Sequence, residues 1–217
     1  MSLPAQDIIG SISGGLVFPV PGHPLCVQIE EQIEHSPDGS APQTMSGTIH
    51  RDQAGRMRTE WTPVSPGSSI RPTTIVDPVE SSILTLESVS KTAIRVTVPA
   101  SRPEQFGFSL PHIVNPLPHG RWKTETESSE QRNIAGVDFE GTRMTNISED
   151  QSSLRMVYEW WASKTLGLIG LAIASGPNGK HTLRIRHIDW RIPDPALFTV
   201  PSDYVLRELH LPGPDRE

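Results

Sequence analysis

The stretch LCVQIEEQI, residues 25–33, alternates between two kinds of side chain. Its odd positions are Leu25, Val27, Ile29, Glu31 and Ile33, while its even positions are mostly polar. Because successive side chains of a strand point to opposite faces, this alternation predicts a β-strand with one dry face and one wet face. Glu31 is the single exception, a charged residue in phase with apolar ones.

The next segments along the chain predict a β-hairpin. Asp52–Gly55 is typical of a hairpin turn, with glycine at the position that favours positive φ. On the return strand Met57, Thr59 and Trp61 share one face. The loop before the hairpin and the loop after it are rich in Pro, Ser and Gly, so the hairpin is bounded on both sides.

Apolar residues recur at every second position in both halves of the chain, which predicts further strands. These cover residues 73–77, 82–86, 92–98, 133–147, 153–162, 166–175 and 181–192. The stretch 166–175 is apolar on both faces, which favours a strand covered on both sides. Within 181–192 the apolar phase changes between Ile185 and Ile188, which predicts a β-bulge near Arg186–His187.

Two regions lack this period. Residues 99–130 are proline-rich and include the polar run KTETESSEQ, so we expect a loop-rich insertion there. The stretch RIPDPALFTVPSDY, 191–204, brackets Leu197-Phe198 with prolines. We interpret it as a docking segment that tucks this pair into the fold before a last short strand around Tyr204–Leu206.

The expected organisation is a single mainly-β domain, β-rich α+β in class. We expect a flexible N-terminal segment over 1–22, a strongly curved antiparallel sheet of about nine or ten strands over 23–208, and a C-terminal tail over 209–217. The 99–130 insertion is expected to cover part of the sheet.

The composition restricts the class of protein. The chain has 217 residues, a formal net charge of −6 and 20% charged residues, which indicates a globular protein with no general affinity for nucleic acid. No apolar run reaches roughly 18 residues, so no transmembrane segment is predicted. The start, MSLPAQD, resembles what remains after signal-peptide cleavage behind a short replacement start. We therefore expect the mature form of an exported protein, periplasmic or secreted.

The sequence contains no motif that carries catalysis or binds a metal. Its eight histidines form no cluster of ligand spacing, although His50, His181 and His187 lie on predicted strands. SGPNGK, 175–180, lacks the spacing of a phosphate loop and leads into a strand. Cys26, the only cysteine, is interpreted as a small buried or half-exposed strand residue. We predict no catalytic residue, no metal and no cofactor.

The neighbouring pair Trp160-Trp161 must divide between the two faces of its strand. One tryptophan is then a core residue, and the other lies on the opposite face, against the insertion or a ligand. With the two-faced apolar strand this pair forms a candidate ligand-binding surface, consisting of Trp160, Trp161, Leu168, Leu171, Ile173 and Trp190.

Arginines recur on the predicted strands. They either line a groove for an anionic head group or form cross-strand ion pairs, and the second arrangement is the more common one. They are Arg56, Arg58, Arg143, Arg155, Arg184 and Arg186.

Several fragments resemble a group of uncharacterised exported proteins of soil bacteria, notably acidobacteria. In order they are GTIHRDQAGRMRTEW, TTIVDPV, KTAIRV, IAGVDFEGTRMT, EWWASKTLG and RIPDPALFTVPSDY, reaching from Gly47 to Tyr204. That group is in turn distantly similar to the outer-membrane lipoprotein carrier superfamily. This resemblance implies an unclosed antiparallel half-barrel whose concave face holds acyl chains, and it implies no catalytic residues.

Three hypotheses of function remain open. The first is a non-enzymatic cell-envelope protein that binds an apolar or acylated ligand in the concave face of the sheet; it fails if the protein's own side chains fill that face. The second is a protein–protein interaction or self-assembly module that uses exposed sheet edges. The third is an enzyme, which requires His50, His181 or His187 within hydrogen-bond reach of a carboxylate in a cleft.

Overall fold

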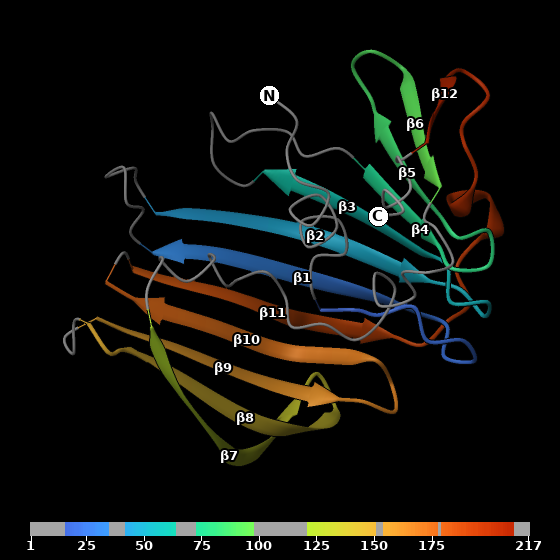
Figure 1. Cartoon of the computed structure of the whole chain (residues 1–217). Helices are drawn as coiled ribbons and strands as arrows, with labels where there is room; N and C mark the ends of the chain where they lie inside the picture. The colour runs from blue at the N-terminus through green and yellow to red at the C-terminus, as the bar shows by residue number, and fades with distance from the viewer. Residues whose placement is uncertain are drawn as a thin grey trace, which may run out of the picture.

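The computed structural model describes residues 16–34, 42–63, 73–97, 121–150, 154–177 and 179–210. They form one twelve-stranded sheet in the order β12-β6-β5-β4-β3-β2-β1-β11-β10-β9-β8-β7. Its two edge strands, β12 and β7, are not paired with each other, so the sheet is not closed. Figure 1 shows the sheet curving strongly from β7 at one end to β4–β6 at the other. The mainly-β fold class and the unclosed, curved sheet are therefore confirmed.

Two antiparallel meanders, β1–β6 and β7–β11, make up most of the sheet, and the pairing of β1 with β11 joins them. β12 lies beside β6 and is parallel to it, the exception to the expected antiparallel order. The strands are β1 (Leu25–Glu34), β2 (Gln43–Arg51), β3 (Met57–Pro63), β4 (Thr73–Asp77), β5 (Ser82–Glu87), β6 (Thr92–Thr97), β7 (Trp122–Ile134), β8 (Val137–Ser148), β9 (Arg155–Ser163), β10 (Leu168–Gly176), β11 (Gly179–Asp189) and β12 (Val205–His210).

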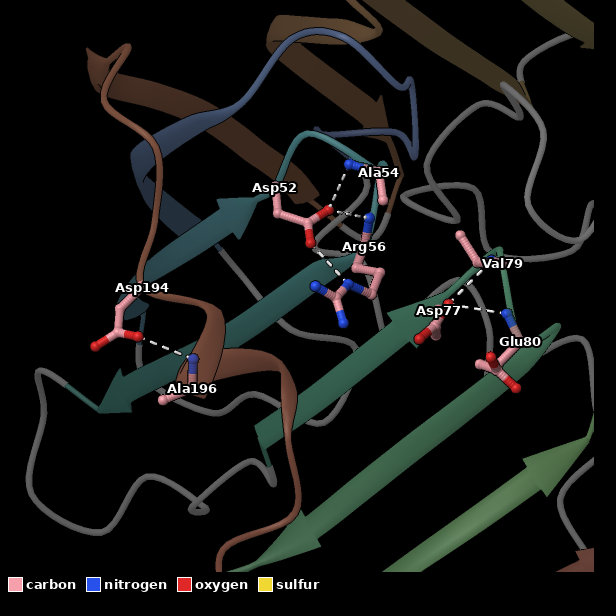
Figure 2. A network of polar contacts seen from close by, with 8 residues as sticks. All are labelled: Asp52, Ala54, Arg56, Asp77, Val79, Glu80, Asp194 and Ala196. Carbon is pink, nitrogen blue, oxygen red and sulfur yellow. Dashed lines mark hydrogen bonds and ion pairs between the residues drawn. The ribbon is translucent and has the colours of Figure 1, made fainter.

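Turn chemistry fixes the ends of several strands. Asp52 accepts hydrogen bonds from the backbone N–H groups of Ala54 and Arg56, and Gly55 takes φ +86°. Asp77 likewise accepts from the N–H groups at positions 79 and 80 (Figure 2). Aspartate favours such positions because its side chain bonds to the backbone of the following residues. The predicted hairpin turn at 52–55 is confirmed.

The predicted bulge in β11 is also confirmed. The register against β1 shifts where Gln28 pairs with His187 and Ile29 pairs with Ile185, which leaves Arg186 as the extra residue. The side chains of Arg184 and Arg186 both bond to the carboxylate of Glu30. This ion-pair cluster ties the two meanders together on the outer face.

The middle of the chain differs from the expectation in two ways. A turn at Ala135–Gly136 divides the predicted strand 133–147 into the end of β7 and most of β8. Trp122–Glu130, expected within the insertion, belong to β7, whereas the rest of the insertion, to residue 120, lies outside the described residues. β7 is exposed on both faces, so its sequence has no apolar period to reveal it.

The C-terminal segment docks as expected. Asp194 accepts a hydrogen bond from the Ala196 N–H and caps a short 3₁₀ helix, Pro195–Phe198 (Figure 2). Phe198 is buried against β4–β6, with the guanidinium of Arg56 5.3 Å from its ring centroid. Arg58 donates to the carbonyl oxygen of Leu197 at 2.9 Å. The segment then leads into β12.

Two apolar clusters lie on opposite faces of the sheet. The smaller one, here the C-terminal cluster, consists of Ile75, Leu84, Leu86, Ala93 and Phe198. The larger cluster extends over the face that the odd positions of β1 and β2 share, here called the core face; the opposite face is the outer face. At β8–β10 the larger cluster continues on both faces of the sheet.

The members of the larger cluster are Leu16, Val17, Phe18, Leu25, Val27, Ile29, Met45, Ile49, Met57, Trp61, Val76, Ile83, Phe139, Trp161, Ala162, Leu168, Ile169, Ala172, Leu183, Ile185 and Ile188. The N-terminal residues take part in it: Leu16, Val17 and Phe18 are buried, and Val17 forms a bridge with Leu168. Of the segment expected to be flexible, residues 1–15 lie outside the described ranges.

Candidate functional site

A fully buried arginine, Arg51, lies on the apolar core face. Arg51 ends β2 in phase with Met45 and Ile49, and its cross-strand neighbours are Leu25 and Met57. All four neighbours are buried, and Arg51 itself is 0% exposed. A charged side chain is almost never fully buried unless it is paired, so this residue requires an explanation.

The guanidinium of Arg51 bonds only to backbone oxygens. Nε donates to the carbonyl of His23 at 2.9 Å, and Nη1 donates to that of Phe18 at 2.7 Å and reaches that of Gly167 at 3.4 Å. Nη2 is buried, and no described residue forms a hydrogen bond with it. No carboxylate among the described residues pairs with it. Burial lowers the pKa of Arg51 to about 10, so the group is still a cation at neutral pH.

Two of these three carbonyls do not depend on Arg51. The Phe18 carbonyl also accepts from the Val20 N–H at 2.8 Å, and the Gly167 carbonyl also accepts from the Phe18 N–H at 2.9 Å. The third carbonyl, that of His23, has Arg51 as its described donor. Without Arg51, only the His23 carbonyl would therefore lose its described hydrogen-bond donor.

The turn beside Arg51 requires glycine. Gly167 has φ +59°, and a Cβ atom there would lie 2.3 Å from Cγ2 of Val20 and 3.3 Å from Nη1 of Arg51. A side chain at this position would be strained and would displace its neighbours. The close approach holds the segment before β1 against the turn that precedes β10.

A second polar group on the core face is the pair Glu31–His181. Glu31 is the exception in the alternation of residues 25–33, and it is 7% exposed. Its Oε1 lies 2.8 Å from Nε2 of His181, the two residues coming from neighbouring strands. The cross-strand neighbours of Glu31 are Met45 and Leu183, both buried apolar residues.

Tyr158 supplies a third polar group. It lies on β9, is 3% exposed, and its hydroxyl oxygen is buried without a hydrogen-bond partner. Burial raises the pKa of this phenol, so it is neutral and able to donate a hydrogen bond at neutral pH. Buried hydroxyl groups normally have a hydrogen-bond partner, either in the protein or in an ordered water.

The predicted ligand-binding residues are mostly brought together. Trp161 and Leu168 belong to the larger cluster, and Trp160, Leu171 and Ile173 pack against it. The pairings of β9 place Trp160 opposite Ala172 and Trp161 opposite Leu171, so the two tryptophans divide between the faces as predicted. Trp190, which follows β11 and is 48% exposed, is not part of the larger cluster.

Trp161 is enclosed by the protein itself. It is 1% exposed, its Nε1 donates to the Glu130 carbonyl at 2.9 Å, and the guanidinium of Arg132 lies 3.8 Å from its ring centroid. A Cβ atom at Gly141 would lie 2.7 Å from Nε1, so the indole packs directly on that strand. Trp161 therefore supports the sheet from the outer face and offers no open surface to a ligand.

The core face is shielded from solvent in this structure. Leu25, Val27 and Ile49 are 0% exposed and Ile29 is 1% exposed. The protein's own atoms thus cover these four side chains, which contradicts a permanently open ligand groove. A ligand can reach this face only by displacing the covering atoms.

A pocket of about 240 Å³ lies where β1, β2 and β3 adjoin the bulged residue of β11. Its lining is mainly polar and consists of Gln28, Ile29, Glu30, Ser46, Gly47, Thr48, Thr62 and Arg186. Burial alone would raise the pKa of Glu30, but the hydrogen bonds and charges of Arg184 and Arg186 outweigh it and hold that pKa below its usual value. The pocket therefore presents charges that are already paired. Neither Glu31 nor His181 lines it.

The remaining predicted chemistry is not assembled into a catalytic site. Cys26 pairs across the strands with His50 and Asp189. Burial raises the pKa of the Cys26 thiol and lowers the pKa of His50, so both groups are neutral at pH 7. A thiol of raised pKa is a poor nucleophile. His181 lies within hydrogen-bond distance of the Glu31 carboxylate, and neither residue lines the pocket described above.

Ion pairs account for most of the strand arginines. Arg56 pairs with Asp52, Arg58 with Glu60, Arg143 with Glu127, and Arg184 and Arg186 with Glu30. The prediction of cross-strand ion pairs is confirmed for Arg143, Arg184 and Arg186, whereas Arg56 pairs across its own turn and Arg58 pairs within its own strand. Two negative findings apply to the described residues alone: no cluster of His, Cys, Asp and Glu could hold a metal ion, and no helix is long and apolar enough to cross a membrane.

Sequence reasoning missed Arg51 and Tyr158 as candidate site residues. The signal for Arg51 was present, because positions 45, 47, 49 and 51 share one face of a strand and three of them are apolar or glycine. A charged residue in phase with the apolar residues of a strand indicates a candidate site residue. The alternation of 25–33 showed Glu31 by the same criterion. Tyr158 carries no such signal, since tyrosine is common on buried strand faces.

Comparison with known proteins gives no family. No family model and no curated protein matches the chain. The MucA/MucB complex of Pseudomonas aeruginosa aligns with a TM-score of 0.44 and 9% identity, over 91% of this chain and 60% of that chain. A LolA superfamily protein from Nitrosomonas europaea aligns with a TM-score of 0.39 and 11% identity, over 91% and 98%. The lipoprotein LppX of Mycobacterium tuberculosis gives 0.36 and 9%, over 88% and 99%.

All three TM-scores are below 0.5, and the chain spans only about 60% of the length of the first matched chain. They therefore demonstrate neither a shared family nor a shared function. The resemblance to exported proteins of soil bacteria stays a prediction.

Proposed function

We propose that this chain is a non-enzymatic binding protein that holds an apolar or acylated ligand against the core face of its sheet. The guanidinium of Arg51 contacts the anionic or carbonyl end of that ligand. The observation that carries the proposal is the fully buried Arg51 side chain, whose Nη2 has no partner among the described residues and whose charge no described carboxylate neutralises.

The energetic argument concerns the cost of this arginine. Moving an unpaired guanidinium into an apolar core costs several kcal/mol, and an apolar residue of similar volume would fill the space without that cost. Because two of its three acceptor carbonyls have other donors, packing alone does not account for the charge. A ligand oxygen at Nη2 would provide the missing interaction.

The surrounding residues suit the rest of such a ligand. In the proposal the acyl part lies along the apolar core face, with Trp160 at its side and the hydroxyl of Tyr158 as a second donor for a ligand oxygen. Leu168, Trp161, Leu171 and Ile173 back the strands from the outer face. We keep Trp190 as a peripheral contact, because its indole is half exposed.

Uptake of the ligand has to open the core face. The atoms that shield it must be displaced, and an incoming anion competes with the carbonyls of Phe18 and His23 for the same guanidinium. Ligand binding and release of the segment before β1 are therefore coupled in this proposal.

The first experiment is native mass spectrometry of the purified protein before and after extraction with organic solvent. A copurifying lipid of defined mass, lost on extraction, is the expected result. If the protein carries no such mass, the second experiment decides: oleate and its methyl ester are titrated into delipidated protein and followed by tryptophan fluorescence.

Oleate is expected to bind at least tenfold more tightly than its methyl ester, because only the acid carries a charge for Arg51. Arg51→Met should remove that difference and leave the binding of the ester unchanged. Arg95→Met, which removes a half-exposed arginine of β6, is the matched control and should behave as wild type. Equal binding of acid and ester to the wild type, or no binding of either, would refute the proposal.

The cell-envelope location is part of the proposal and rests on the sequence resemblance. Fractionation of cells that produce the full-length natural protein tests it. Recovery in the cytoplasm would contradict this part and leave the binding experiments unaffected.

A further inference from the structure

The edge strand β12 carries an unusual surface for a sheet edge. Val205 is 64% exposed, Leu209 is 53% exposed and Leu206 is 41% exposed. Val205, Arg207 and Leu209 alternate along one face of the strand, so an exposed cation lies between two exposed apolar side chains. No described residue forms an ion pair with Arg207. On the other face the charge of Glu208 is already matched by Arg95 at 3.0 Å.

The backbone of β12 has free hydrogen-bonding groups at the outer edge. The Val205 N–H donates to the carbonyl of Lys91 at 2.8 Å, so position 205 points toward β6. Because the direction alternates along a strand, the N–H and C=O groups of Leu206 and Glu208 point away from β6. Within the described sheet no strand lies on that side.

The opposite edge, β7, is protected in the way edge strands usually are. Its side chains are nearly all exposed and polar, and its pairing with β8 contains a register shift between Ser129 and Arg132. Charged pairs such as Lys123–Glu125 and Arg132–Glu130 lie along it. Charges and bulges prevent unwanted strand pairing. The pairing of β12 has no register shift, and Val205, Leu206 and Leu209 expose apolar side chains along it.

A second copy of the chain fits this edge poorly in the registers that pair most of β12. In an antiparallel pair of identical strands the faces must match, so the register centres on one residue that opposes its own copy. Centring on Arg207 or Glu208 places like charges opposite each other, which is destabilising. Centring on Leu206 places Val205 against the charge of Arg207.

We propose that β12 is a docking edge for an extended segment of another protein, which adds a strand to the sheet. The segment carries an acidic residue opposite Arg207 and apolar residues two positions before and after it, opposite Val205 and Leu209. Main-chain bonds to Leu206 and Glu208 provide the pairing, and the Arg207–acid contact selects the segment. This inference does not depend on the proposed ligand.

The test uses two synthetic peptides, TTVTETVTT and TTVTKTVTT, titrated into the ¹⁵N-labelled full chain and followed by NMR. Their sequences are palindromic, so either strand direction presents the same pattern to β12. The acidic peptide should shift the amide signals of Leu206 and Glu208 and bind about fivefold or more tightly than the lysine peptide, as expected for exchanging an opposite for a like charge across a strand pair.

Three variants complete the test. Leu206→Pro removes a free N–H without removing a bond to β6 and should abolish binding, with the β6 amide signals unchanged. Arg207→Glu should reverse the preference in favour of the lysine peptide. Val89→Ala, at an apolar turn residue that is 81% exposed, should bind as wild type.

Three results would overturn the proposal. The first is equal affinity for the two peptides, and the second is signal changes that lie elsewhere in the sheet. The third is concentration-dependent dimerisation that Leu206→Pro removes, because it would assign the edge to a second copy of the chain.

Discussion

The larger cluster and the C-terminal cluster pack on the same sheet, but they differ in what they bury. The C-terminal cluster buries only apolar side chains, and the arginines beside it keep their charges at its margin, paired with Asp52 and Glu60. The larger cluster adjoins a fully buried guanidinium, a buried carboxylate and a buried phenol without a partner. The first cluster is entirely apolar, whereas the second adjoins polar groups whose burial is costly.

In a chain without sequence motifs, costly buried polar groups indicate where function lies. A protein tolerates unfavourable buried groups where activity needs them, so local inconsistency marks a functional surface. We therefore expect substitutions in the C-terminal cluster to change the free energy of unfolding and not the affinity for ligand. Substitution of Arg51 should change the affinity for ligand and not the free energy of unfolding.

The largest expected effect is that of Phe198→Ala. This change removes a buried ring from between β4–β6 and Arg56, and it should lower the free energy of unfolding by about 3–4 kcal/mol. Urea denaturation measures the loss, and the binding of oleate by the folded variant should be unchanged. Ile192→Ala is the control, because that side chain is 69% exposed and its removal should cost less than about 0.5 kcal/mol. A loss of ligand affinity in Phe198→Ala would contradict the distinction between the two clusters.

An intermediate effect is expected for Glu30→Gln, which removes a charge that is properly paired. Hydrogen bonds to Arg184 and Arg186 should make this carboxylate contribute about 1–2 kcal/mol at pH 7. Because its pKa is lowered in the folded state, the contribution is present above the unfolded value of about 4.3 and is lost as pH falls through the folded pKa.

Unfolding curves of wild type and Glu30→Gln between pH 7 and pH 2 measure this dependence. The two proteins should differ at neutral pH and converge at the acid end. A difference that stays constant over the whole range would show that the ion pairs do not stabilise the fold.

The smallest expected change in stability is that of Arg51→Met. The variant loses the bond to the His23 carbonyl but no longer has to bury a charge, so its free energy of unfolding should stay within about 1 kcal/mol of wild type. Urea denaturation at pH 7 in the absence of lipid measures it. A loss of 3 kcal/mol or more would place Arg51 among the structural residues, and the distinction between the two clusters would fail.

Much of the local structure follows from the sequence. The alternation in 25–33, the turn at Asp52–Gly55 and the phase change before Ile188 each predicted the observed element, because each depends on neighbours along the chain. The docking of Leu197-Phe198 was also predicted, since two flanking prolines exclude a continued strand.

The remainder depends on contacts that local patterns do not encode. β7 has no dry face, so no period marks it, and the neighbours of β1 and β12 are chosen by distant segments. For the candidate site, periodicity placed five of the six proposed ligand residues in or against the larger cluster. It did not show that Trp161 is enclosed, because the covering residues Glu130 and Arg132 belong to the strand that had no signal.

The order of the strands also has a consequence for how the chain folds. Each meander forms through hairpins between consecutive strands, which close short loops quickly, whereas the β1–β11 seam brings together Cys26 and Asp189 from opposite ends of the sequence. Closing so long a loop has a high entropic cost before any contact is gained. We therefore expect the two meanders to collapse separately and the seam to form late. Its Glu30–Arg184–Arg186 cluster would then mainly slow unfolding of the completed sheet.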